Sequence, residues 1–399
     1  MQFELTQEQR EWQMKARKFA KEEIRPISLA RDRVEEPAGT WDWDIIKKGS
    51  RLGFRTAAVP KAWGGYGIDY VTQALVMTEL AKADSAISKA FSQNWKWSHL
   101  IAGACTEEQK ERFLEPFLAD DTYVLGMGGT EPNAGSDNRY PPEDDPKAGV
   151  RLRAERQGDH WILNGEKTFI ANGGVGKMFF ALARTNPDVP VQQGATIFMV
   201  PTDTPGFRIG KIFNKAGWRF YQNGELIFEN ARVPHANVLG EVNGAHKARS
   251  KGGAEFNDFE LAANALGVCD DACESGMSYA KSRIEGGKPL FEQQVIQLKL
   301  AEMHMLTEAL RSFVMRLAYE IDRSAHSQAD VVLLMNFSCD VIQKVTQLNM
   351  DIHAAAGEMN EHAEKLVRDG IIWTHLGGDA SQRLKVMRRL APATAIAAH

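Results

Sequence analysis

The sequence predicts an α+β protein of three domains: an N-terminal α-helical domain (1–121), a central β-sandwich or barrel-like domain (122–238) and a C-terminal four-helix bundle (239–399). Three observations lead to this prediction. Helical patterning fills the first 120 residues, short runs rich in β-branched and aromatic residues fill the middle, and helical patterning returns near residue 255. A helical, β, helical order implies an α-bundle that a β-domain interrupts.

The N-terminal domain opens with a well-marked helix. Thr6 and Gln9 have the spacing of a capping box. One apolar face follows, made of Trp12, Ala16, Phe19 and Ile24. We expect this helix to end at Arg25–Pro26, because proline lacks the N–H that a helix interior needs.

The central domain begins near residue 122, where helical patterning gives way to short segments rich in β-branched and aromatic residues. Residues 178–183, 195–200 and 225–233 are expected to be strands, with turn residues between them. Asn164–Gly165 favours a two-residue hairpin turn between two further strands.

The C-terminal domain repeats apolar residues at alternating steps of four and three. This stripe consists of Ile296, Leu300, Met303, Leu310, Val314, Leu317 and Ile321. Such a seam is typical of an antiparallel helix bundle. Further helices are expected over about 331–355 and 360–375.

Composition excludes several classes of protein. The chain has 399 residues, 43% of them hydrophobic, and a net charge of -4 without a long basic run, so nucleic acid is not an expected partner. No apolar run is long enough to span a membrane, and the first ten residues lack a signal peptide's apolar core. The four cysteines have neither metal-type nor CxxC spacing, which indicates a reducing cytoplasm and no metal site.

One loop, Thr130–Asp137, is rich in residues that leave backbone N–H groups free for a phosphate or a flat polar cofactor. The glycines at 173–176 do not form a dinucleotide fingerprint, because they precede a strand and do not open a helix.

Three segments, taken in order and at their separations, resemble the acyl-CoA dehydrogenase family of flavoenzymes. They read Thr-Glu-Pro-Asn-Ala-Gly-Ser-Asp over 130–137, Trp-Ile-Leu-Asn-Gly-Glu-Lys-Thr-Phe-Ile-Ala-Asn-Gly-Gly over 161–174, and Arg-Ile-Glu-Gly-Gly-Lys-Pro-Leu over 283–290. The resemblance implies FAD between the β-domain and the bundle, an acyl-CoA substrate, an electron-transfer flavoprotein as electron acceptor, and a homotetramer of two dimers. A partner subunit would complete each FAD site.

The resemblance also assigns cofactor residues around the loop. Met127 leads into it, Gly129 and Thr130 would face the flavin pyrimidine, and Gly135 and Ser136 the pyrophosphate. Phe169 would lie near the flavin ring. At Ala171, where the family usually has a hydroxyl, the backbone N–H would serve flavin N5.

Other cofactor and substrate residues follow from the same resemblance. Arg283 would reach the pyrophosphate of the neighbouring subunit's FAD, and Asp351 and Ala355 lie in the segment expected at the adenosine end of that FAD. The substrate pocket would involve Gln93, Trp95 and Trp97, whose bulk indicates a short or flat acyl group.

The chain departs from the family at the catalytic base, which must reach the substrate α-proton. The usual Glu position is Gly377, and the position used by a minority of members falls near Asn257. Three explanations remain open: Asp379 is the base, Asp258 or Glu255 is the base, or no α-proton is removed in the usual way. Asp379 would also suit a helix N-cap.

The resulting functional hypothesis is α,β-dehydrogenation of a small or cyclic acyl-CoA. The alternatives are a same-fold flavoprotein with other chemistry (a desulfinase, a 1,4-dehydrogenase or a reductase) and a relative that binds acyl-CoA or flavin without turnover.

Overall fold

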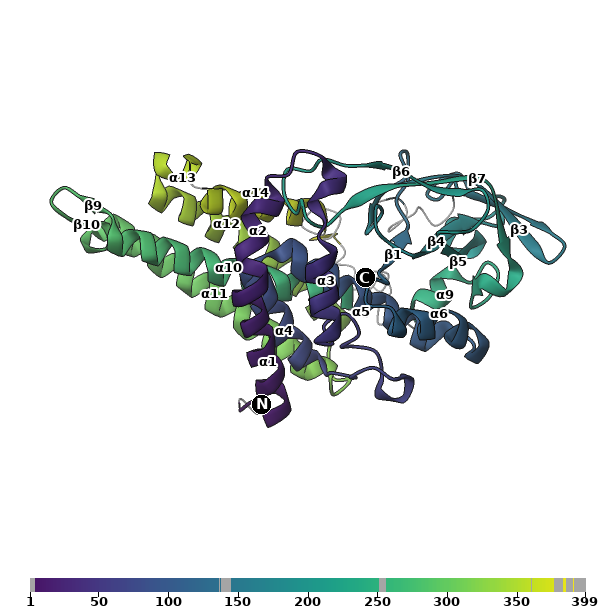
Figure 1. Cartoon of the computed structure of the whole chain (residues 1–399), viewed down its shortest axis with the longest axis horizontal. Coiled ribbons are helices and arrows are strands. Elements are labelled where there is room, and N and C mark those ends of the chain that lie inside the picture. The colour runs from purple at the N-terminus through teal and green to yellow at the C-terminus, as the bar shows by residue number, and fades with distance from the viewer. Residues whose placement is uncertain are drawn as a thin grey trace, which may run out of the picture.

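The computed structural model describes residues 4–135, 137, 145–250, 256–359, 361–376, 383, 384 and 390. Helices occupy both ends of the chain and strands its middle, so the predicted order of domains along the chain is confirmed (Figure 1).

The N-terminal helices are α1 (Gln7–Phe19), α2 (Arg25–Asp32), α3 (Trp43–Arg51), α4 (Tyr70–Ala83), α5 (Ser85–Ala104) and α6 (Glu107–Ala119). The capping box is confirmed, because the side chains of Thr6 and Gln9 bond each other's backbone N–H. The expected end at Pro26 is wrong. A π-helical turn, Ala20–Ile24, joins α1 to α2 without a break, and Pro26 lies in the first turn of α2, directly after the change of hydrogen-bond pattern.

The central strands are β1 (Leu125–Gly128), β2 (Arg153–Gln157), β3 (His160–Ala171), β4 (Met178–Arg184), β5 (Ala195–Pro201), β6 (Phe207–Ile212), β7 (Asn223–Pro234) and β8 (Val238–Leu239). All belong to one sheet of order β6-β7-β3-β2-β4-β5-β8, with β1 also paired to β4. Short helices α8 (Val191–Gly194) and α9 (Ala245–Ser250) flank it.

The predicted hairpin turn at Asn164–Gly165 is wrong. Both residues lie within the continuous strand β3, and the β2–β3 turn falls at Gly158–Asp159 instead. Asn164 accepts a hydrogen bond from the backbone N–H of Asn230 in β7, and the β3–β7 register shifts here. A bulge needs the same positive-φ residues as a tight turn, and Gly165 has φ +135°.

The C-terminal helices are α10 (Phe256–Ser282), α11 (Gln294–Ile321), α12 (Gln328–His353), α13 (Ala355–Met359) and α14 (Glu361–Leu376). The predicted apolar stripe is buried along α11. Helix α10 packs against α11, α12 and α14 of the bundle and also against α4, so it joins the bundle to the N-terminal domain. The small hairpin of β9 (Ile284–Glu285) and β10 (Lys288–Pro289) projects from the end of the bundle opposite the sheet (Figure 1).

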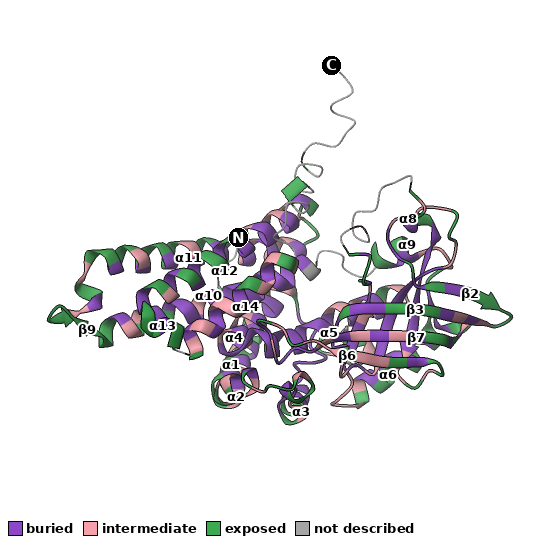
Figure 2. Ribbon diagram, turned by 90° about the horizontal axis from the view of Figure 1, so that it is seen from above, coloured by how far each residue is buried: buried purple, intermediate pink, exposed green. Residues whose placement is uncertain are grey.

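Two hydrophobic cores meet along α5. One core joins the N-terminal helices to the bundle and includes Trp95. The other fills the β-domain and includes Trp97 (Figure 2). The boundary between helices and sheet therefore lies beside α5, where the sequence places the substrate.

Within the described ranges, no helix has the length and apolarity to cross a membrane, and no three metal-ligating side chains gather into a group.

Candidate cofactor and substrate site

Two acidic side chains hold the loop that follows β1, and one of them, Glu131, is buried. Glu131 is almost fully buried and forms an ion pair of 2.6 Å with Lys167 of β3. Its oxygens also accept hydrogen bonds from the backbone N–H groups of Arg151 (2.7 Å) and Leu152 (2.9 Å). Because this carboxylate is shared among several partners, the loop is rigid at its start.

Asp137 holds the other end of the loop. Its two carboxylate oxygens accept hydrogen bonds from the backbone N–H groups of Gly135 (2.7 Å) and Gly149 (3.1 Å). A compact turn lies between the two acids, since Glu131 and Ala134 exchange backbone hydrogen bonds of 2.8 and 3.2 Å. Ser136 lies outside the described residues.

The glycines of this region fall into two groups. A Cβ at Gly126 would lie 2.6 Å from the Ala171 carbonyl oxygen, and one at Gly128 3.1 Å from the Lys167 side chain, so these glycines allow β1 to pack closely. A Cβ at Gly129 or Gly135 would meet nothing within 4 Å. Open space beside the two glycines assigned to the cofactor fits a flat ligand laid against the backbone.

The end of β3 bulges next to this open space. The β3–β7 register shifts between Lys167 and Ile170, and Phe169 has a φ of 56°. Its ring is 61% exposed and lies 4.7 Å from that of Phe213. A positive φ in a bulky residue is strained, and such strain is concentrated at ligand sites. Phe169 is therefore presented outward, as a ring that packs on a cofactor requires.

The bulge and the loop are directly joined. The backbone N–H of Thr168 donates to the Thr130 carbonyl oxygen at 2.9 Å. Met127 is half-buried on β1, and Ala171 is half-buried at the end of β3, opposite Asn223 of β7. The structure thus brings the start of the loop, with Met127, Gly129 and Thr130, beside the end of β3, with Phe169 and Ala171, while Gly135 lies farther along the loop, where its N–H bonds Asp137.

The remaining predicted cofactor residues lie elsewhere. Arg283 follows α10 beside the β9–β10 hairpin, and Asp351 and Ala355 are exposed at the end of α12 and the start of α13. Figure 1 shows these elements at the opposite end of the molecule from β1 and β3. Asp351 accepts hydrogen bonds from Gln347 (2.9 Å) and Lys299 (3.3 Å), so its charge is partly compensated. One chain alone does not bring the two groups together.

The residues assigned to the substrate are buried in α5. Gln93 is 4% exposed. The indole N–H of Trp95 donates to the Phe54 carbonyl oxygen at 2.6 Å, so this ring lies in the helical core. Trp97 packs 5.8 Å from Phe180 of the sheet, and no described atom accepts a hydrogen bond from its indole N–H. Their role toward a substrate stays a prediction.

Of the candidate bases, only Asp258 can be placed. It lies in the first turn of α10 and is 7% exposed. Burial raises the pKa of Cys339 of α12 to about 12, and the charges of Asp340 and Asp258 act in the same direction. Asp379, Glu255 and the usual position, Gly377, lie outside the described residues.

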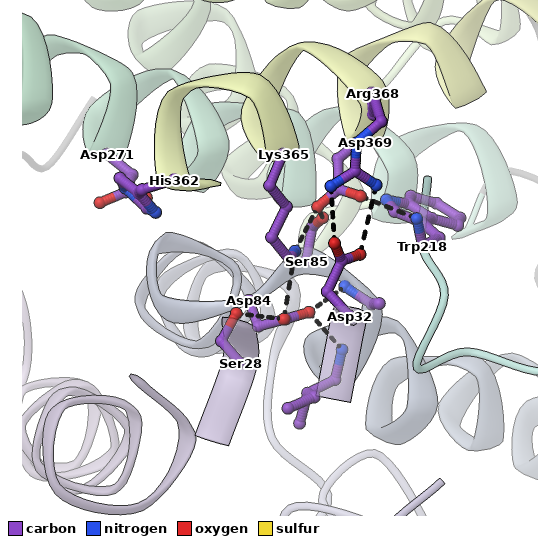
Figure 3. Close-up of polar contacts among 12 residues, drawn as sticks. Ser28, Asp32, Asp84, Ser85, Trp218, Asp271, His362, Lys365, Arg368 and Asp369 are labelled. Atoms are coloured by element: carbon purple, nitrogen blue, oxygen red, sulfur yellow. Dashed lines mark hydrogen bonds and ion pairs between the residues drawn. The ribbon is translucent and has the colours of Figure 1, made fainter. Parts of the chain in front are cut away.

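A buried ionic network fixes α14, the helix that precedes residue 377 (Figure 3). Lys365 pairs with Asp369 at 2.6 Å and with Asp84 at 3.2 Å, and Arg368 pairs with Asp32 at 2.6 Å. Asp369 also accepts the backbone N–H of Trp218 at 2.7 Å. The nearby carboxylates raise the pKa of Lys365, against the opposite effect of burial. The network ties α14 to α2, to α5 and to the loop before β7.

The polar residues that support the site were not predicted from the sequence. Glu131 was recognised only as part of a motif, and Lys167 was not singled out. One signal was available, since Leu163 and Lys167 alternate in phase along β3 and an inward-facing lysine requires a buried partner.

Comparison with known proteins agrees with this geometry. Models of the acyl-CoA dehydrogenase N-terminal, middle and C-terminal domains match residues 6–121, 126–231 and 253–391. An acyl-CoA dehydrogenase of Bacillus subtilis is 31% identical over 98% of this chain and 100% of its own length.

Solved structures give the same result. Butyryl-CoA dehydrogenase from Megasphaera elsdenii superposes with a TM-score of 0.88 at 30% identity, over 97% of this chain and 98% of that one. A chain from a study of the electron transferring flavoprotein of Acidaminococcus fermentans superposes with a TM-score of 0.89 at 30% identity, over 98% and 100%. This chain therefore belongs to the acyl-CoA dehydrogenase family, FAD-dependent oxidoreductases that act on CH–CH bonds.

Proposed function

We propose that this protein oxidises a small or cyclic acyl-CoA thioester between its α and β carbons. The observation that carries the proposal is the joined pair of cofactor elements, the loop from Thr130 to Gly135 that Glu131 anchors and the strained Phe169 bulge. The Thr168–Thr130 hydrogen bond joins them, and a Cβ at Gly129 or at Gly135 would meet no atom within 4 Å, so the backbone of the loop is open to a ligand.

In this proposal FAD is held by Met127, Gly129, Thr130, Gly135 and Ser136, with Phe169 and Ala171 at its ring. When bound, FAD supplies the acceptor for the hydride that leaves the substrate Cβ. The chain's own part is to orient the ring and the thioester and to exclude water from them.

The proton from Cα requires a carboxylate, and the proposed candidates are Asp379, Asp258 and Glu255. Carboxamide variants distinguish them, because Asp379→Asn, Asp258→Asn or Glu255→Gln keeps the shape and removes the base. The true base should lose about 10²–10⁴-fold in the rate of flavin reduction. Asp270→Asn, also on α10 but paired with Arg311, is the matched control.

One observation supports a second candidate, a reaction other than α,β-dehydrogenation. The usual position of the base is Gly377, and no glutamate replaces it at Asn257. A same-fold enzyme such as a desulfinase, a 1,4-dehydrogenase or a reductase is therefore the second candidate, and a non-catalytic acyl-CoA-binding relative is the third.

A second copy of the chain is proposed to complete each site. Arg283, Asp351 and Ala355 lie at the far end of the bundle from the Phe169 bulge, so their predicted role toward FAD requires a neighbour (Figure 1). Helix α11 supports this, because Val295, Leu298 and Met305 expose 57%, 72% and 72% of their surface in one apolar stripe. The proposed assembly is a tetramer of two dimers that passes electrons to an electron-transfer flavoprotein. The free cysteines 105, 269, 273 and 339 support a reducing, cytoplasmic setting.

Anaerobic titration of the FAD-loaded protein with a panel of acyl-CoAs tests the proposal. Loss of the oxidised flavin absorption with short or cyclic acyl-CoAs, and not with long-chain ones, is the expected result. Sulfite release from a sulfinated thioester would identify a desulfinase, and binding of acyl-CoA without any flavin change would identify the non-catalytic relative.

A further inference from the structure

A half-buried lysine lies beneath the Phe169 bulge. Lys215 is in the loop between β6 and β7, and its ammonium donates to the Tyr221 carbonyl oxygen (2.5 Å) and to Asn223 Oδ1 (2.6 Å). Asn223 Nδ2 in turn donates to the Phe169 carbonyl oxygen at 2.8 Å. Three residues from separate elements thus form one chain of hydrogen bonds that ends on the strained residue.

The hydrogen bond from Lys215 sets the orientation of the Asn223 side-chain amide. The protonated lysine has only donors, so in that form the amide oxygen must face Lys215 and the amide nitrogen must face Phe169. The Phe169 carbonyl therefore receives a donor at the peptide that follows its unusual φ of 56°. Without that donor, nothing at Asn223 would favour the left-handed conformation over the ordinary extended one.

Shielding this ammonium from water has a free-energy cost. Burial lowers the pKa of Lys215 to about 7, while the negative charge of Asp369 opposes that change. No carboxylate among the described residues forms an ion pair with Lys215. A half-buried cation that is held by a carbonyl and an amide gives up part of its hydration without gaining an ion pair.

We propose that Lys215 is a positioning residue for the cofactor: through Asn223, it holds the Phe169 bulge in the shape that receives the flavin ring. The inference rests on the proposed function, since it takes the bulge to be part of the FAD site. It also makes a claim about the polypeptide alone, which can be tested without FAD.

Two variants remove different members of this series of hydrogen bonds. Lys215→Met removes the ammonium with little change in length. Asn223→Asp keeps an acceptor for Lys215 but loses the donor to Phe169. Asn230→Asp, on the same strand and also at positive φ, adds the same charge elsewhere, and Lys211→Met removes an exposed lysine from β6. Backbone hydrogen exchange of segment 168–172 in the apoprotein and the Kd for FAD of each variant are then measured.

Both test variants should exchange segment 168–172 at least about tenfold faster and bind FAD at least about tenfold more weakly, since hydrogen bonds to charged groups have this magnitude. The double variant should be no worse than the more severe single one, because both act on one link. The controls should match the wild type.

The inference is refuted if folded Asn223→Asp keeps wild-type exchange in this segment and an FAD Kd within about twofold of wild type. That variant decides the question by itself if Lys215→Met does not fold. A wild-type protein that takes up no FAD would refute the proposed function instead, and the exchange comparison would still support or refute the Lys215–Asn223–Phe169 link.

Discussion

At the scale of single residues, the site depends on charges that are buried in pairs. Lys167 and Glu131 expose 0% and 3% of their side chains. Burial lowers the pKa of Lys167 to about 8, so it is still protonated at pH 7 and the pair is ionic. Such a pair fixes geometry, and removing one member leaves the other charge without compensation.

Glu131→Gln should therefore destabilise the protein by about 3–5 kcal/mol, the cost typical of breaking a buried pair. Chemical denaturation measures this. Glu229→Gln removes one member of an exposed pair with Arg208 and should cost less than about 1 kcal/mol. The double variant Glu131→Gln/Lys167→Met should recover much of the loss. Equal costs for the two single variants would show that the Glu131 pair is not stabilising the loop.

A second residue-scale prediction concerns His99 and acid stability. Burial lowers the pKa of His99 to about 4, and no described atom hydrogen-bonds its Nε2. Between the ordinary pKa of 6.5 and about 4, the unfolded chain binds a proton that the folded one excludes. Stability that is present above pH 6.5 is therefore lost as the pH falls toward 4.

His99→Phe should flatten this loss, because its ring can pack near Tyr70 and Phe256 without titrating. Denaturation midpoints at several values between pH 4 and 7 measure the slope. The exposed His304 of α11 offers the control, since His304→Phe should leave the slope unchanged. An unchanged slope in His99→Phe would contradict the prediction.

At the scale of elements, the glycines at β1 have two different roles. Gly126 lies within the strand and allows close packing, whereas Gly129 follows the strand and leaves space for a ligand. Gly126→Ala should destabilise the protein, because the new methyl group would lie 2.6 Å from a β3 carbonyl oxygen and 2.7 Å from Phe179. Gly129→Ala should leave the melting temperature unchanged and weaken FAD binding by about tenfold or more. Thermal denaturation of the apoprotein and FAD titration distinguish the two effects, and a stable Gly126→Ala variant would count against the close β1–β3 packing.

The elements also show which structural features local sequence patterns can predict. The stripe along α11 and the capping box of α1 were predicted correctly, because helical periodicity and capping depend on neighbours three and four residues apart. Asn164–Gly165 was misread because a bulge and a hairpin turn use the same residues, and only pairing with Asn230 distinguishes them. The Glu131–Lys167 pair joins residues 36 positions apart, which no local pattern reveals.

At the scale of the whole molecule, the predicted cofactor residues are divided between two ends. The loop and the bulge lie at the sheet, whereas Arg283, Asp351 and Ala355 lie at the far end of the bundle (Figure 1). The family resemblance already implied that a partner subunit completes each FAD site, and the distance between the two groups within one chain is what that expectation requires. The division predicts sites shared between subunits.

Mixing two defective variants tests this sharing. Gly129→Leu should block the sheet half of a site by filling its open space, and Arg283→Ala should disable the bundle half. Neither variant alone should retain FAD. Random pairing of equal amounts makes about half of the dimers mixed. In a mixed dimer with a symmetric shared interface, one site carries both defects and the other carries none. About a quarter of all sites should therefore bind FAD. If each site were built within one chain, every site would carry a defect and mixing would restore no FAD binding. Flavin content per chain after co-refolding therefore decides between a shared and a self-contained site.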